Sequence, residues 1–139
     1  MPNWVDCDLK VSGDKVEIDK FTALAKKEDN VLSLEKFIPY PKKFKNLSWR
    51  EWCLKNWGTK WDVNGAVIIK EGETYIKYNF ATAWSPPLPV IIKMSELFQD
   101  LLFDLKYYEG AMKFKGHFEV KSGNIITNDE STYNGDRGG

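Results

Sequence analysis

Tryptophan and lysine are concentrated in one short stretch of this chain, and these are the side chains best suited to ligand chemistry. Residues 52–61 read WCLKNWGTKW and hold three tryptophans and two lysines. Aromatic faces stack on rings, and ammonium groups offset phosphate charge. The stretch therefore favours recognition of an anionic molecule that carries a ring.

The stretch belongs to a basic, aromatic quarter of a chain that has no net charge overall. Residues 36–61 hold seven basic side chains against Glu51 alone, a net charge of +6, interleaved with seven aromatic residues. The rest of the chain is correspondingly acidic. Because the net charge is zero, we do not expect strong, sequence-independent binding to nucleic acids, an affinity that contacts to phosphates dominate.

We expect the binding site where this stretch leaves its predicted helix, together with a tryptophan before a proline-rich corner. A second interpretation stays open for the same residues, in which the tryptophans cap a core edge and the lysine is solvated. For Trp49 and Trp52, docking of the helix onto a sheet is favoured. The candidate ligand-binding residues are Trp57, Gly58, Thr59, Lys60, Trp61 and Trp84.

No residue pattern in the sequence predicts catalysis or metal binding. The single histidine, His117, falls with the polar set of an alternating strand, where a surface role is typical, and no nucleophile pattern accompanies it. Cys7 and Cys53 are too far apart for a zinc cluster, and Asp6 and Asp8 fit a solvated strand face. Phosphate-loop motifs such as GxxxxGK are absent from the sequence. We predict a protein that is not an enzyme and needs no cofactor or metal.

Composition predicts a soluble, cytoplasmic domain. The chain is 42% hydrophobic and 29% charged, as globular proteins are, and its 139 residues suit one domain. No apolar run approaches the ~20 residues of a membrane span. The first ten residues lack a signal-peptide pattern, and the two separated cysteines indicate a reducing compartment. Oligomeric state stays open.

Hydrophobic periodicity predicts an α+β fold with a mostly antiparallel sheet and helices packed on one face. In the first strand, Val5, Cys7, Leu9 and Val11 alternate with polar residues and should point inward. One domain is expected over 1–127, followed by a disordered polar tail over 128–139. Strands are predicted at 3–11, 31–38, 66–70, 74–82, 103–109, 113–120 and 124–127, and helices at 14–27, 48–57 and 90–101.

Several phrases of the sequence, taken together, resemble the Api92-like family of phage and plasmid proteins, whose domain is called YubB ferredoxin-like. They are MPNW, FIPYP, WCLKNWGTKWD, FATAWSPP and YYEG, within residues 1–120. The resemblance implies a ferredoxin-like α+β fold, a mobile-element origin and no catalytic residues. The family usually begins MPNWC, whereas Val5 stands here and the cysteine is Cys7, so no role for a thiol at position 5 carries over.

Three functions compete at this point. The first is a non-enzymatic binding protein of a mobile element that sequesters a small anionic ligand, such as a nucleotide signal, and so counters host defence. The second is an adaptor or inhibitor that binds a host protein, because tryptophan, tyrosine and arginine are typical of interface hot spots. The third is a weak nucleic-acid-binding module that uses the sheet or the basic loop at 40–46.

Overall fold

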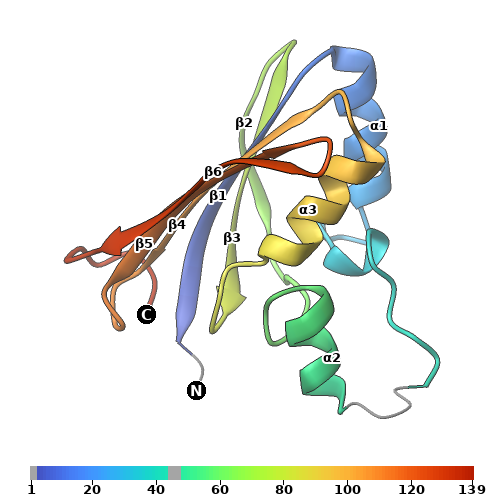
Figure 1. Ribbon diagram of the computed structural model, residues 1–139. Helices are drawn as coiled ribbons and strands as arrows, with labels where there is room; N and C mark the ends of the chain where they lie inside the picture. Colours follow the sequence, from blue (N-terminus) through green and yellow to red (C-terminus); the bar gives the residue numbers. More distant parts are fainter. Residues whose placement is uncertain (1–2, 44–47) are drawn as a thin grey trace.

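Six antiparallel strands form one open sheet, with helices on a single side of it (Figure 1). The computed structural model describes residues 3–43 and 48–139. The open sheet with helices on one side confirms the predicted α+β class with a ferredoxin-like arrangement. The sheet has the order β2-β3-β1-β4-β5-β6. Its elements are β1 (Trp4–Ser12), α1 (Lys15–Ala25), the 3-10 helix η1 (Leu34–Lys36), α2 (Trp49–Asn56), β2 (Val67–Glu71), β3 (Tyr75–Ala83), α3 (Leu88–Leu97), β4 (Leu102–Glu109), β5 (Phe114–Lys121) and β6 (Asn124–Thr132).

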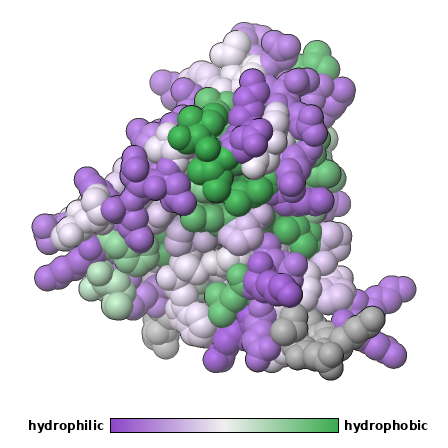
Figure 2. Space-filling model, viewed as in Figure 1, coloured by the Kyte–Doolittle hydropathy of each residue, from purple (hydrophilic) through white to green (hydrophobic). Residues whose placement is uncertain are grey.

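Strand β1 lies inside the sheet between β3 and β4, and its alternation decides which face is covered. Val5, Cys7, Leu9 and Val11 are fully buried beneath the helices, as predicted. The intervening polar side chains share the opposite, open face. Figure 2 shows that the surface in the same view is mostly hydrophilic, with hydrophobic residues gathered near its middle. Within the described residues, no helix is long and apolar enough to cross a membrane.

Helix α2 begins and ends as its sequence predicts. The Ser48 hydroxyl accepts a hydrogen bond from the Glu51 backbone N–H at 3.2 Å. At the other end, the Gly58 N–H donates to the Cys53 carbonyl, and Gly58 has φ +83°, a conformation that glycine adopts without strain. Helix α1 also forms where expected, although the Asp14 side chain makes no capping hydrogen bond.

The predicted strand at 31–38 is wrong. This segment contains η1 and pairs with no strand of the sheet. The cause is the Asp62 carboxylate, whose Oδ1 accepts the Leu34 N–H at 2.7 Å and whose Oδ2 accepts the Ser33 hydroxyl at 2.7 Å. A side chain 28 residues away therefore uses a backbone donor that a sheet partner would have needed.

The predicted disordered tail at 128–139 is also wrong, and the domain boundary at 127 moves with it. Strand β6 continues to Thr132, which pairs with Phe114 of β5. The chain then returns across the sheet, where the Gly139 N–H donates to the Trp4 carbonyl at 2.7 Å. A polar sequence is compatible with an edge strand whose side chains face water, so polarity alone did not indicate disorder here.

Both edges of the sheet expose apolar side chains. In β2, Val67, Ile68 and Ile69 are 50%, 40% and 49% exposed. The pairing of β2 with β3 shifts between Ile68 and Lys70, so Ile69 is an extra residue that forms a β-bulge. Strand β6 forms the opposite edge.

Candidate functional site

Two of the six predicted site residues hold the loop after α2 in place and do not face solvent. Trp57 is fully buried, and its indole N–H donates to the Ile38 carbonyl at 2.9 Å. Thr59 is also fully buried, and its hydroxyl donates to the Ala83 carbonyl at 2.7 Å. Both predictions of ligand contact are therefore wrong. These side chains bind the loop to the core and to the end of β3, which fixes the position of their neighbours.

The remaining tryptophans of the α2 stretch behave differently from one another. Trp49, which helical spacing assigned to the docking face, is 41% exposed. Trp52 does pack against the core, with its ring 5.2 Å from the Trp57 ring and 5.4 Å from the Tyr40 ring. The predicted apolar face therefore docks through Trp52 and the buried Cys53, whereas Trp49 at the first position of α2 stays at the surface.

Gly58 sets the path of the loop. A Cβ atom at this position would collide with the Pro89 ring, so the backbone passes directly against the corner that leads into α3. The Gly58 carbonyl accepts the Ser85 hydroxyl at 2.5 Å, and its N–H is already bonded within the end of α2. Gly58 therefore joins two segments and offers no free N–H to a phosphate, contrary to the prediction for this residue.

Lys60, Trp61 and Trp84 do come together, as predicted. The Lys60 ammonium lies 4.7 Å from the centre of the Trp61 ring and 4.4 Å from that of the Trp84 ring. The Lys60 backbone N–H donates to the Ala83 carbonyl at 3.2 Å, which holds the loop beside the end of β3. From α2, the Arg50 guanidinium lies 5.3 Å from the Trp84 ring centre.

Trp4 extends this group and was missed by the sequence reasoning. Its ring centre lies 5.8 Å from that of Trp61, and both residues line a cavity of about 420 Å³ with Asp62, Asn64 and Ala81. The signal that could have found Trp4 is its place in the outward set of the alternating first strand. We call Trp4, Arg50, Lys60, Trp61 and Trp84 the cation–aromatic cluster.

The backbone of Trp84 is strained. Its φ is +78°, in the left-handed region that bulky residues avoid, and its N–H donates to the Asn3 carbonyl at 2.9 Å. The side chain is nevertheless 39% exposed, so core packing alone does not account for it. Strained conformations of this kind concentrate at functional sites.

The two cations of the cluster have no acidic partner in the part of the chain that the structure describes. Across residues 3–43 and 48–139, neither Lys60 nor Arg50 forms an ion pair with a carboxylate. Glu51 follows Arg50 directly in the sequence, and no ion pair of Glu51 is formed within the described residues. Asp62, the acid nearest to Lys60 in sequence, uses its oxygens to accept bonds from η1 and from the Val63 N–H at 2.7 Å. The positive charge of the cluster is therefore available to an external anion.

A second group of polar side chains lies on the open face of the sheet. His117 Nε2 is 3.0 Å from Asp104 Oδ1 and 3.7 Å from Glu119 Oε1, and the Thr127 hydroxyl donates to Glu119 at 2.8 Å. The His117 side chain is 37% exposed and lies in the polar set, as predicted. One imidazole and two carboxylates within 4.8 Å of one another could hold a divalent metal. Sequence spacing missed the group because its members come from paired strands, with Asp104 opposite Glu119.

Asp6 and Asp8 bind a cation of the chain itself. Arg137 Nε lies 2.8 Å from Asp6 and its Nη2 lies 3.1 Å from Asp8, while the Asn79 amide donates to both carboxylates. Burial alone would raise the pKa of Asp6, but the hydrogen bonds from Arg137 and Asn79 hold that pKa below its ordinary value. Glu109, at the end of β4, is not part of this group, because its oxygens accept the N–H groups of Ala111 and Met112 in the following turn.

The open antiparallel sheet, with helices on one side and a cation–aromatic cluster at one end, defines a small ferredoxin-like α+β protein. Residues 56–137 match the family described as "Ferredoxin-like domain in Api92-like protein", and the chain belongs to this family. Among solved structures, a protein api92 from Yersinia pseudotuberculosis is similar, with a TM-score of 0.74 and 9% identity over 94% of this chain and 98% of that one. At that identity the likeness concerns the fold alone. No curated protein matches the chain.

Proposed function

We propose that the protein is a non-enzymatic binding protein whose cation–aromatic cluster takes a small anionic ligand with a ring, such as a nucleotide. The observation that carries the proposal is Lys60, which lies close to the rings of Trp61 and Trp84 and has no carboxylate partner among the residues that the structure describes. The ammonium offers its charge to a phosphate, and the exposed ring beside it offers a stacking surface.

The geometry supports a modest affinity. Stacking on one tryptophan contributes about 2 kcal/mol, and two charge-assisted contacts from Lys60 and Arg50 contribute about 2 kcal/mol each. The sum corresponds to a Kd on the order of 10–100 μM. The Asp62 carboxylate also lines the cavity beside Trp61 and Trp4, and its negative charge would oppose an anion placed deep in that cavity.

The biological use that we propose for this binding depends on the family resemblance and not on the cluster. In a phage or plasmid, sequestering a nucleotide signal of the host would counter a defence response. The ligand class and the biological context are therefore separate parts of the proposal.

The experiment is a titration of the full chain with mono-, di- and cyclic nucleotides, with tryptophan fluorescence and thermal melting as the readouts. A ligand of the native state should quench fluorescence and raise Tm by mass action. Lys60→Ala should weaken binding about thirtyfold, the equivalent of about 2 kcal/mol. Trp84→Asn should do the same, since asparagine tolerates the left-handed backbone. The matched control is Lys55→Ala, which removes an exposed lysine of α2. Equal binding of every nucleotide to the natural chain and Lys60→Ala would exclude the site.

A second candidate, an adaptor that binds a host protein, is favoured by the pairing of exposed Trp84 with Arg50. Both residue types are enriched at interface hot spots. A purified host protein that binds the natural chain but not Trp84→Asn, in the absence of any nucleotide response, would select this candidate. The third candidate, weak nucleic-acid binding, requires an affinity that falls steeply with salt.

A further inference from the structure

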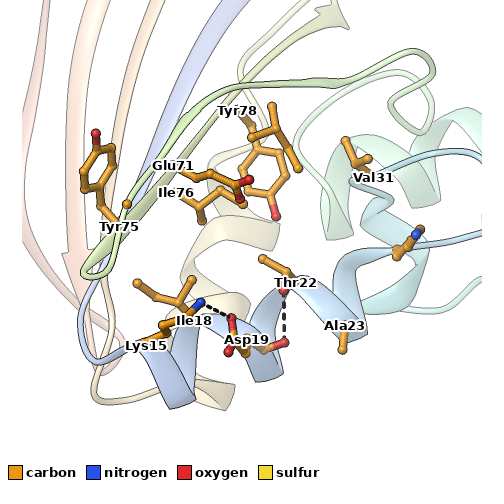
Figure 3. Close-up of a pocket in the computed structure, with 13 residues that line it drawn as sticks. Lys15, Ile18, Asp19, Thr22, Ala23, Val31, Glu71, Tyr75, Ile76 and Tyr78 are labelled. Carbon is orange, nitrogen blue, oxygen red and sulfur yellow. Dashed lines mark hydrogen bonds and ion pairs between the residues drawn. The ribbon is translucent and has the colours of Figure 1, made fainter.

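A second cavity lies between α1 and the β2–β3 hairpin (Figure 3). Its volume is about 340 Å³, within the range of small-molecule sites. Strand β3 is nine residues long, about 30 Å, and the cavity lies toward its start whereas Trp84 follows its end. The cavity is therefore separate from the cation–aromatic cluster. Its walls include Ile18 and Thr22 of α1, Val31, Ile68, Ile76 and Tyr78.

The hydroxyl group of Tyr78 is the unusual feature of this cavity. The side chain is fully buried, and its oxygen has no hydrogen-bond partner within the described part of the chain. Figure 3 shows the Tyr78 ring directed from β3 toward α1, across the cavity. Buried polar groups nearly always have partners, and an unsatisfied one costs about 1–3 kcal/mol. The orphaned hydroxyl therefore indicates a partner that residues 3–43 and 48–139 do not supply.

The protonation state of Tyr78 makes it a hydrogen-bond donor. Burial, together with the nearby Glu71 carboxylate, raises the pKa of Tyr78 far above its ordinary value. The phenol thus keeps its proton at every physiological pH and can donate it to an acceptor.

The charges around the cavity argue against an ionised ligand. Two cations and two acids line it, and one pair, Lys15 and Asp19, is already formed at 3.3 Å. The other two are Lys26 and Glu71, and the proximity of Glu71 to Tyr78 disfavours an anion at the inner end. The remaining wall is largely aliphatic.

We propose that this cavity binds a small uncharged molecule with an apolar body and a carbonyl-type oxygen that accepts the Tyr78 hydrogen bond. The apolar body packs against Ile18, Ile68 and Ile76. This site is additional to the one that binds the proposed anionic ligand, and neither depends on the other.

Two probes of nearly identical shape test the proposal on the full chain. Acetophenone carries a carbonyl oxygen, and α-methylstyrene carries a methylene group in the same place. Each is titrated while amide NMR shifts of the cavity residues are followed. We expect acetophenone to bind about five to ten times more tightly, as one neutral hydrogen bond predicts. The preference should disappear in Tyr78→Phe.

Tyr75→Phe is the matched control, because it removes the same atom from another tyrosine of the cavity. Figure 3 shows the Tyr75 hydroxyl directed away from α1, so this variant should keep the preference for acetophenone. Three results overturn the proposal: no shift of cavity amides with acetophenone, equal binding of the two probes to the natural chain, or a preference that survives in Tyr78→Phe.

A folding measurement tests the orphaned hydroxyl independently of any probe. Without a partner to lose, Tyr78→Phe should melt at the same temperature as the natural chain or at a higher one. A Tm lower by more than about 3 °C would show that the hydroxyl has a partner in the folded protein, and would overturn the proposal.

Discussion

Replacing Arg137 by alanine should destabilise the fold, because Arg137 is 131 residues from Asp6 in sequence but contacts it in space, on strand β1 inside the sheet. The guanidinium joins Asp6 and Asp8 of β1, at 2.8 and 3.1 Å, and lies 4.1 Å from the Tyr108 ring centre. Arg137→Ala removes all three contacts and leaves two neighbouring carboxylates, held then by the Asn79 amide alone.

The magnitude follows from partial burial. The side chains of Arg137, Asp6 and Asp8 are 35%, 27% and 16% exposed. Each bond should therefore fall between a surface ion pair, below about 1 kcal/mol, and a buried charge-assisted hydrogen bond, up to about 3 kcal/mol. We expect the free energy of unfolding to fall by about 2 kcal/mol, and Tm to fall by about 6 °C.

Urea unfolding followed by tryptophan fluorescence at pH 7 measures the change. The transition midpoint should fall while the slope m stays constant. Arg137→Lys should be intermediate, because a single ammonium cannot satisfy both acids in the same geometry. Arg50→Ala is the control, since Arg50 has no ion pair in the described structure, and it should change stability by less than about 0.5 kcal/mol.

The pH dependence gives a second check with a defined sign. The folded pKa of Asp6 lies below the ordinary carboxyl value of 3.8, so the contribution of Asp6 to stability is complete above that value. It is lost as pH falls through the folded pKa, and the gap between the natural chain and Arg137→Ala should close there. Equal urea midpoints at pH 7, or a gap that does not narrow as pH falls below 3.8, would refute the reasoning.

Three further predictions concern the loop and the core. Asp62→Ala should cost about 2–3 kcal/mol of unfolding free energy, because it leaves buried donors unpaired, and Asp62→Asn should recover part of the loss in urea unfolding. Gly58→Ala should lower the free energy of unfolding by about 3 kcal/mol, because residue 58 has a positive φ and an added Cβ would collide with the Pro89 ring. Thermal melting measures the change, and an unchanged Tm would show that the backbone does not pass so close to Pro89. The thiols of Cys7 and Cys53 are buried and their pKa values are raised, so neither should react with a disulfide reagent until urea unfolds the chain. Reaction of either thiol in the folded protein would contradict this prediction and would show that the core opens locally.

The sequence predicted those elements whose side chains show a strong local period. The strand containing Val5 to Val11 alternates cleanly, and the helix after Ser48 has both a capping residue and a terminal glycine, so both formed where expected. The strand prediction for residues 31–38 failed because their apolar composition fits a strand as well as it fits the observed segment with η1. The choice was made by Asp62, a long-range contact that no local pattern contains.

The candidate site was predicted in part for a similar reason. Spacing placed six residues in one region, but exposure depends on where the loop meets the end of β3. Thr59 and Trp57 turned inward to bond carbonyl groups of distant segments, whereas Lys60 and Trp61 stayed at the surface. Trp4 joined them through strand order, which brings β1 beside β3.

The bulge at Ile69 has a consequence for how molecules of this protein meet one another at high concentration. A straight apolar edge would act as a template for a strand of a neighbouring molecule, and such templates seed fibrous aggregates. The extra residue in β2 interrupts the regular spacing of backbone N–H and C=O groups along the edge. A regular strand of another molecule therefore cannot form a continuous ladder of hydrogen bonds with β2. The irregularity thus protects solubility on the edge where three consecutive aliphatic side chains meet water.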